Sequence, residues 1–340
     1  MKIKNRIINN QKPFIVAEIS GNHNGSLSIL KKTILAAKKC KVDAIKLQSY
    51  TPDDLTLNIK KKKFLINNVK NKWKNKYLFD IYSKGQTSLS WHKKIFDFCN
   101  KQKIICFSSP FSEKMVDELE KLNCPAYKIA SLEITNINLL KKISQTKKPV
   151  ILSTGAANLR EIVNAEKIFR GNKNFAILKC TVDYPCENSE VNLNGLKTLK
   201  NRFKNHQIGF SDHTIGSLAS ISAISLGASI IEKHFIYDKS INSVDNFFSV
   251  DRFEMKEFVK NCNLVPRILG SKTLKPTKSE INSLKYRRSI FVGEKIKKGQ
   301  IFSKNNIKAV RPATGTPLKF YKKILGTKAK KNYVPGDKIF

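Results

Sequence analysis

The sequence has 340 residues, of which 41% are hydrophobic, and a formal net charge of +38 at pH 7. This length accommodates one large domain and a small one, and no apolar run reaches the 18 residues that would suggest a membrane span. The excess charge is mostly Lys and lies on expected helix faces without a nucleic-acid-binding motif, so we expect a solvated basic surface and no nucleic-acid function.

The N-terminus and the cysteines give the same expectation for the location of the protein. The N-terminus is basic, but no apolar signal core follows before Pro13, so the cytoplasm is the default location. The seven cysteines form no CxxC pair. An odd number of scattered cysteines fits a reducing compartment and predicts no disulfide framework.

Short apolar, β-prone runs recur along the first two thirds of the chain. They lie at 14–20, 42–48, 104–109, 126–130, 149–153, 175–180, 207–211 and 229–234. Stretches with helical periodicity separate them, such as 28–40, 91–102, 112–122 and 215–226. Alternating strands and helices predict a parallel sheet, and eight units predict a (β/α)8 TIM barrel. An open doubly wound sheet is the alternative, but no GxGxxG follows the first strand.

The segment at 56–89 lengthens the second unit. It carries four consecutive lysines at 60–63 together with Trp73, Tyr77 and Tyr82. Such an insertion can cover the barrel mouth or can be a solvated surface excursion, and the sequence leaves both open.

The pattern changes after residue 235. A helix is expected at 253–269, followed by a polar linker at 270–284 and a small β-rich module at 285–340. Short strand-like pieces occur at 289–292, 301–302, 307–310 and 338–340, with turns marked by Lys-Gly and Pro-Gly pairs. We therefore expect a catalytic barrel domain at 1–269 and a separate small domain.

Polar residues at the expected strand ends indicate an anion site. Two lysines, Lys46 and Lys128, lie inside otherwise apolar strands, where an unpaired ammonium group is costly to bury. Hydroxyl side chains follow the neighbouring strands, namely Ser109, Ser131, Ser153 and Ser211. The set favours a phosphate or carboxylate site, although both lysines can instead pair with internal glutamates.

Two of the five histidines, His213 and His234, fall at the ends of the last two strands. Residues two apart on a strand share a face, so Ser211 points with His213 and Glu232 with His234. Imidazoles placed in this way can share a divalent ion with water and substrate. A structural histidine pair is the other interpretation.

The ordered motifs as a set resemble the sialic acid synthase family. They are AEISGNHNGS at 17–26, AIKLQ at 44–48, FSSPF at 107–111, YKIAS at 127–131, LSTG at 152–155, GFSDHT at 209–214 and IEKHF at 231–235. IKKG at 296–299 and VRP at 310–312 resemble that family's SAF (antifreeze-like, β-clip) domain. YTPDDLT at 50–56, Trp73, WH at 91–92, ASLE at 130–133 and RS at 288–289 are most similar to the pseudaminic acid synthase branch.

The resemblance implies an activity and a role for each matching residue. Family members condense phosphoenolpyruvate with an amino-sugar aldehyde to give a nine-carbon α-keto acid. N-acetylneuraminate or legionaminate synthesis is the alternative, and a non-catalytic carbohydrate-binding protein is a more distant one. The phosphoenolpyruvate-binding residues would be Lys46, Ser109, Lys128, Ser131, Ser153 and Ser211, and the family often has Asn where this chain has Val182.

The remaining implied roles concern the metal, the aldehyde and the sugar. His213 and His234 would hold a divalent ion, Mn²⁺ or Mg²⁺, and would be catalytic together with Glu18, which would act near the aldehyde as an acid or orienting base. The sugar would contact Gln48, Glu133, Tyr184, Asp245 and Arg311. The last residue would come from the partner subunit of a domain-swapped homodimer.

Overall fold

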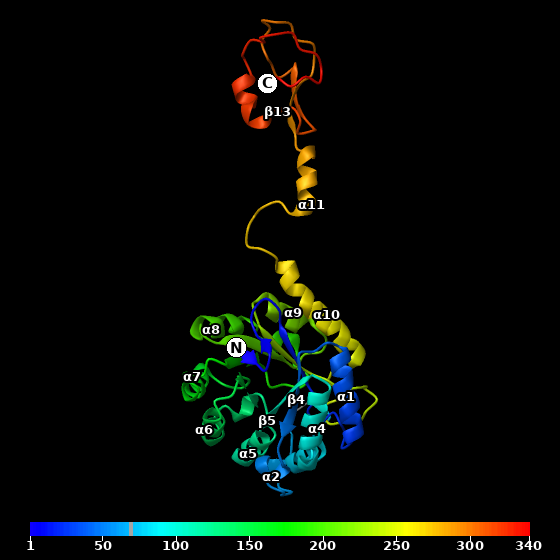
Figure 1. Ribbon diagram of the computed structural model, residues 1–340, viewed down its shortest axis with the longest axis vertical. Coiled ribbons are helices and arrows are strands. Elements are labelled where there is room, and N and C mark those ends of the chain that lie inside the picture. The colour runs from blue at the N-terminus through cyan, green and yellow to red at the C-terminus, as the bar shows by residue number, and fades with distance from the viewer. Residues whose placement is uncertain (68–70) are drawn as a thin grey trace. The chain divides into compact units, whose positions relative to one another are not determined.

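A closed barrel of eight parallel strands forms the larger part of the protein (Figure 1). The computed structural model describes residues 1–67 and 71–340, which divide into two compact units, Met1–Gly270 and Ser271–Phe340. The barrel strands are β3 (Phe14–Glu18), β4 (Ala44–Ser49), β5 (Ile105–Pro110), β6 (Tyr127–Ile129), β7 (Val150–Ser153), β8 (Phe175–Cys180), β9 (Gln207–Asp212) and β10 (Ile230–His234). Each falls on one of the eight apolar runs, which confirms the predicted TIM barrel.

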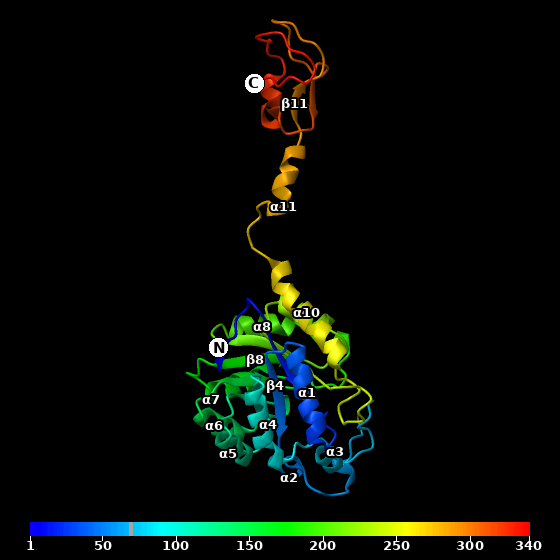
Figure 2. The same cartoon turned by 45° about the vertical axis from the view of Figure 1, so that its right-hand side comes forward.

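Helices connect successive strands and surround the barrel (Figures 1 and 2). They are α1 (Leu27–Lys39), α2 (Pro52–Leu55), α3 (Leu78–Gly85), α4 (Leu89–Lys101), α5 (Glu113–Lys121), α6 (Ile137–Gln145), α7 (Leu159–Ile168), α8 (Asn194–Arg202), α9 (Leu218–Ser225) and α10 (Arg252–Leu269). Side chains satisfy the free backbone amides at several helix starts. Ser26 accepts a hydrogen bond from the amide of Ile29, and Asp251 and Glu254 form a capping box on α10.

Smaller elements complete the first unit. A hairpin of β1 (Lys2–Ile3) and β2 (Arg6–Ile7) precedes the barrel, and three 3₁₀ helices lie in its loops, η1 (Lys62–Phe64), η2 (Ser131–Glu133) and η3 (Asn188–Glu190). The barrel strands are almost continuously buried, as is usual for parallel strands covered on both faces. All seven cysteines are buried and free. Across the described residues, no helix combines the length and hydropathy needed to cross a membrane.

The second unit is a small β-rich module with its own core. It contains α11 (Lys278–Ile281), η4 (Asn282–Tyr286), β11 (Ser289–Val292), β12 (Ile307–Val310), β13 (Thr316–Pro317), η5 (Leu318–Phe320) and α12 (Tyr321–Ile324). The three strands form an antiparallel sheet in the order β12-β11-β13. Ile290, Phe302 and Ile307 are among its buried apolar residues.

Three expectations for this part of the chain need correction. Residues 301–302 form no strand, because Ile301 makes only an isolated bridge with Lys328. Residues 338–340 form no strand, because the amides of Ile339 and Phe340 donate to the Thr316 hydroxyl at 2.9 and 3.3 Å instead of to a backbone ladder. The stretch at 270–284, expected to be a polar linker throughout, contains α11. A capping box of Thr277 and Glu280 starts this helix.

Candidate active site

The register of the barrel brings the expected strand-end residues to one edge. His234 on β10 lies beside Glu18 on β3, and Glu18 lies beside Lys46 on β4. Ser211 on β9 lies beside Glu232. Because all eight strands run in parallel, their carboxyl ends meet at the barrel mouth, where TIM barrels build their active sites.

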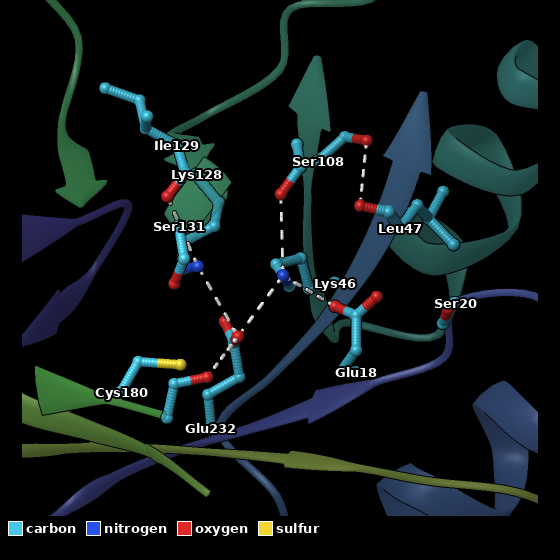
Figure 3. A network of polar contacts seen from close by, with 12 residues as sticks. Glu18, Ser20, Lys46, Leu47, Ser108, Lys128, Ile129, Ser131, Cys180 and Glu232 are labelled. Carbon is cyan, nitrogen blue, oxygen red and sulfur yellow. Dashed lines mark hydrogen bonds and ion pairs between the residues drawn. The ribbon is translucent and has the colours of Figure 1, made fainter. Parts of the chain in front are cut away.

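Two lysines and two glutamates form a buried charged cluster at this edge (Figure 3). Lys46 Nζ lies 2.9 Å from Glu18 Oε2 and 3.3 Å from Glu232 Oε1, and Lys128 Nζ lies 3.5 Å from the same Glu232 oxygen. None of the four side chains is more than 5% exposed. The structure therefore contains the lysine–glutamate pairing that was one of the two expectations for Lys46 and Lys128.

The two glutamates respond to burial in opposite ways. Burial raises the pKa of Glu18 to about 7, and the neighbouring Glu232 carboxylate acts in the same direction. Lys46, with a smaller effect of Lys128, only partly offsets the increase. Burial would also raise the pKa of Glu232, but Lys128, Lys46 and the Ser211 hydroxyl, which donates to it at 3.0 Å, lower that pKa to about 2. Near neutral pH, Glu232 is therefore ionised while Glu18 exchanges a proton.

Several buried polar atoms of the cluster lack a hydrogen-bond partner. In the part of the chain that the structure describes, five of the six such side-chain atoms belong to Glu18, Ser153, Glu232 and His234. Glu18 Oε2 keeps its ion pair with Lys46 but has no hydrogen bond of good geometry. Unsatisfied buried groups are rare in native proteins, so their concentration here indicates a binding site rather than a purely structural charge network.

The remaining hydroxyls expected at the anion site lie in the same region. Ser109 accepts a long hydrogen bond of 3.4 Å from Lys46, and Ser131 accepts one of 3.0 Å from the Gly155 amide. Ser109, Ser131 and Ser153 are all buried. The structure thus gathers the lysines and serines of the expected phosphoenolpyruvate set around one location.

The two expected metal ligands lie next to each other. The rings of His213 and His234 are 5.4 Å apart between centroids. The His213 Nδ1 atom contacts the Thr181 carbonyl at 2.7 Å, which orients the ring, and His234 Nδ1 is buried without a partner. Burial, together with His213 and nearby lysines, holds the pKa of His234 well below its usual value, so this imidazole is neutral.

Neutral imidazole is the form that binds metals, and the unpartnered nitrogen fits a cation. No group of three or more His, Cys, Asp or Glu side chains is arranged to hold a metal ion within residues 1–67 and 71–340. The chain itself therefore offers two imidazoles, and further ligands would have to come from water or substrate.

Asp212 on β9 and Lys233 on β10, which alternate with the site residues along these strands, point away from the site. Asp212 accepts hydrogen bonds from Thr214 and from Ser220 on α9, and Lys233 Nζ lies 3.0 Å from its carboxylate. Both charged side chains are buried. The alternation expected along β9 and β10 is thus observed, and Asp212 and Lys233 join the strands to the helical layer instead of the site.

A cavity of about 400 Å³ lies at the barrel mouth. All four residues expected to contact a sugar from within the barrel line it, namely Gln48, Glu133, Tyr184 and Asp245, and so do Ser131 and His234. Glu18, Lys46 and Lys128 are not lining residues and are nearly inaccessible. The volume falls in the range of small-molecule sites.

Sequence reasoning missed one contribution to this cavity and left a second one open. Ser20 follows β3 with a left-handed φ of 49° and donates a short hydrogen bond to the Asp245 carboxylate. The insertion supplies Ile66, Asn71, Trp73, Leu78, Ile81 and Tyr82 to the cavity wall. Its aromatic residues were a signal for the second contribution, whereas residues 68–70 lie outside the described structure. The insertion is therefore not merely a surface excursion.

Arg311, expected to reach a barrel from a partner subunit, belongs to the second unit and is exposed there. It directly follows β12, at the VRP motif. No arginine is among the described residues that line the barrel cavity. Of the five residues expected to contact a sugar, the cavity of the first unit thus brings together the other four.

Comparisons with known proteins agree with the motifs and the site. Residues 33–274 match the NeuB family and residues 287–339 match the SAF domain. A pseudaminic acid synthase of Campylobacter jejuni is 42% identical over 331 residues, covering 97% of this chain and 96% of the relative. One from Helicobacter pylori is also 42% identical and covers 94% of each chain.

A solved structure shows the same architecture. The N-acetylneuraminic acid synthetase of Leptospira borgpetersenii in complex with citrate superposes with a TM-score of 0.74 at 29% identity, covering 84% of this chain and 95% of that one. The family match covers most of the barrel unit, and the relatives extend over nearly the whole length. The chain belongs to the NeuB family.

Proposed function

We propose that this chain condenses phosphoenolpyruvate with the open-chain aldehyde of a 2,4-diacetamido-2,4,6-trideoxy hexose, giving pseudaminic acid and phosphate. The observation that carries the proposal is the buried pair of lysines, Lys46 and Lys128, next to a cavity whose wall offers sugar-binding groups. The pseudaminic acid synthases at 42% identity support the choice of acceptor.

Phosphoenolpyruvate carries a phosphate and a carboxylate, which suit the cluster. Lys46 and Lys128 would bind these anions together with Ser109, Ser131, Ser153 and Ser211. The contacts of Lys46 and Lys128 with Glu232, at 3.3 and 3.5 Å, are long for charge-assisted hydrogen bonds. Lys128 therefore retains capacity for a substrate anion, Lys46 would share its ammonium group between that anion and Glu18 at 2.9 Å, and the unpartnered Ser153 hydroxyl adds a donor. Val182 lines the cavity where the family often has Asn, and contributes no hydrogen bond from its side chain.

The proposed reaction forms one carbon–carbon bond and releases phosphate. C3 of phosphoenolpyruvate attacks the aldehyde carbon, and the aldehyde oxygen gains a proton as it becomes a hydroxyl. Water adds to C2, and the resulting tetrahedral carbon expels phosphate and becomes the keto group. Glu18, with its pKa near neutrality, is suited to deliver the proton to the aldehyde oxygen, while the lysines hold negative charge throughout.

We propose His213 and His234 as the ligands of a divalent ion, Mn²⁺ or Mg²⁺. A bound ion at this position would polarise the aldehyde carbonyl as a Lewis acid. The neutral, unpartnered His234 and the carbonyl-oriented His213 support this assignment. Their contribution as side chains is to fix the position and orientation of two nitrogen donors at the ends of neighbouring strands.

We also propose a domain-swapped homodimer in which Arg311 of a second chain reaches the sugar. The cavity wall carries Glu133 and Asp245 but no arginine among the described residues, so a guanidinium from elsewhere would balance its charge. Gln48, Tyr184 and these two carboxylates would provide hydrogen bonds to the acceptor's hydroxyl and amide groups.

The test is an acceptor panel with the full-length protein. Phosphoenolpyruvate, Mn²⁺ or Mg²⁺ and one sugar at a time would be supplied, and phosphate release and product mass measured. We expect release with the 2,4-diacetamido-2,4,6-trideoxy acceptor of pseudaminic acid, and loss of release after chelation of the metal. Release with N-acetylmannosamine or the legionaminate precursor alone would favour those alternatives. Sugar binding without phosphate release from any acceptor would favour a non-catalytic protein.

A further inference from the structure

Residues of the barrel and residues of the insertion line the cavity at the barrel mouth. The barrel side presents polar groups, including Gln48, Glu133 and Asp245. The insertion side presents mainly hydrocarbon and aromatic groups, from Ile66, Trp73, Leu78, Ile81 and Tyr82. These five side chains are only half-buried, so their remaining exposed surface is available to whatever enters the cavity. The insertion therefore adds an apolar wall to a cavity in which the barrel places Phe111, Leu132 and Phe248 beside its polar groups.

The polar atoms of the insertion are used to attach it to the barrel. The Trp73 indole Nε1 donates to the Val244 carbonyl at 2.8 Å, and the Asn71 amide donates to the Tyr184 carbonyl at 2.8 Å. The end of α3 is seated tightly as well, since a Cβ on Gly21 would come within 2.7 Å of the Gly85 backbone. The wall is thus anchored on two sides, and its apolar groups are held in fixed positions.

The wall lies one aromatic ring away from the histidine pair. Tyr184 packs against His213 with ring centroids 4.2 Å apart and against Trp73 at 5.3 Å. An acceptor with its aldehyde at the histidines extends roughly 6 Å from C1 to C6, given C–C bonds of about 1.5 Å. The far end of the sugar, with C6 and the acetamido groups, therefore comes within reach of the insertion.

The geometry points to the insertion wall, which includes Leu78 and Ile81 of α3, as the subsite that selects acceptors with methyl groups in place of hydroxyls. This inference rests on the proposed function and names the substrate feature that the insertion recognises: a 6-deoxy carbon and acetamido methyl groups. A hydroxyl held against this wall would lose its hydrogen bonds to water without gaining a partner. Apolar pockets discriminate against one added hydroxyl by about 100-fold.

The test compares two acceptors that differ only at C6. They are the 2,4-diacetamido-2,4,6-trideoxy hexose and its 6-hydroxy analogue of the same configuration. For the unmodified protein with Mn²⁺ and saturating phosphoenolpyruvate, we expect kcat/KM to favour the deoxy acceptor by about 100-fold. Leu78→Asn replaces a hydrocarbon with an amide of nearly the same size. We expect it to reduce that preference at least about tenfold while the KM for phosphoenolpyruvate stays unchanged.

The matched control is Lys84→Asn, which introduces the same residue at an exposed position of the same helix and should keep the full preference. Ile81→Thr, a smaller change one helical turn from Leu78, serves if Leu78→Asn lowers the thermal midpoint. Equal use of both acceptors by the unmodified protein, within about threefold, would overturn the subsite while leaving the proposed reaction intact. A folded Leu78→Asn or Ile81→Thr variant with the original preference would do the same. Absence of phosphate release with every acceptor would overturn the proposed function, and the subsite with it.

Discussion

The carboxyl ends of β3 and β10 are neighbours, yet they create different environments for their glutamates. Glu232 pairs in register with Val16, two residues before Glu18, so Glu18 lies further toward the mouth. Both side chains are buried. Glu232 has two lysines within 3.5 Å and the Ser211 hydroxyl, whereas Glu18 has one lysine. Their pKa values accordingly separate to about 2 and about 7.

The difference shows that burial alone does not set the protonation state of a carboxyl group. The number of cations close to it decides whether the desolvation penalty is overcome. In many enzymes, two carboxyl groups with well-separated pKa values have different catalytic roles. Here Glu232 remains an anion that holds Lys46 and Lys128 together, and Glu18 is left to carry a proton. The predictions below test this division.

Glu18→Gln gives the largest expected effect. The amide keeps the size of the side chain and an oxygen for Lys46 but cannot transfer a proton. We expect kcat for phosphate release to fall by about 10²- to 10⁴-fold, the usual contribution of a general acid or base, while calorimetry still detects phosphoenolpyruvate binding. Glu187→Gln, at an exposed loop position, is the control and should retain full activity. A Glu18→Gln variant within about tenfold of the unmodified rate would contradict the role.

Glu232→Gln tests the other strand end through stability. The substitution removes the only carboxylate paired with Lys128 among the described residues and leaves its buried charge uncompensated. We expect a loss of about 3–5 kcal/mol in the free energy of unfolding. Urea unfolding followed by tryptophan fluorescence measures it, since Trp73 and Trp91, the two tryptophans of the chain, both belong to the barrel unit.

The control for that measurement is Glu118→Gln. Glu118 makes an ion pair of 2.7 Å with Lys121, but both side chains are exposed to solvent. Exposed pairs of this kind contribute about 0–1 kcal/mol. Equal losses in the free energy of unfolding for Glu118→Gln and Glu232→Gln would contradict the prediction. They would mean that the buried charge of Lys128 does not depend on Glu232 for compensation.

Much of the fold was predictable from the sequence because its signals are local. Eight apolar runs at barrel spacing predicted the strands, and Ser, Asn and Asp before amphipathic stretches are typical of helix starts. The alternation of side chains also predicted that Glu232 would share a face with His234. The prediction for 338–340 was wrong because a single side chain, that of Thr316, replaces a strand partner there.

The sequence left lysine–glutamate pairing open as one alternative, but it could not identify which glutamates pair with Lys46 and Lys128. Lys46, Lys128 and Glu232 come from β4, β6 and β10, which are not adjacent in the sheet, so they meet only across the closed barrel. No spacing in the sequence reports such a contact. The apolar wall was equally hidden, since Leu78 and Ile81 read as ordinary helix residues until α3 is placed over the cavity.

The pH dependence of catalysis separates the two glutamates without mutation. The pH profile of kcat/KM reports the groups of the free enzyme. Glu18, with its pKa raised to about 7, is protonated below that pH, so as a proton donor it should cause kcat/KM to fall about tenfold per unit above pH 7. Glu232, with a pKa of about 2, should add no transition between pH 5 and 9. A loss on the acidic side of pH 7 instead would identify Glu18 as a base.

The smallest expected effect is a partial rescue of activity in mixed dimers. It tests whether Arg311 of one chain completes the active site in the barrel of the other. Glu18→Gln and Arg311→Ala proteins should each be inactive alone. If Arg311 acts across subunits, mixed dimers contain one barrel with an intact Glu18 and an intact Arg311 from the other chain, and the second barrel lacks both. Random exchange then restores roughly a quarter of the unmodified activity, because half of the dimers are mixed and each has one competent site. If Arg311 acts within its own chain, no mixture contains a competent barrel. Phosphate release that stays at the level of the separate variants, after subunit exchange has been verified by mass, would therefore rule out the swap.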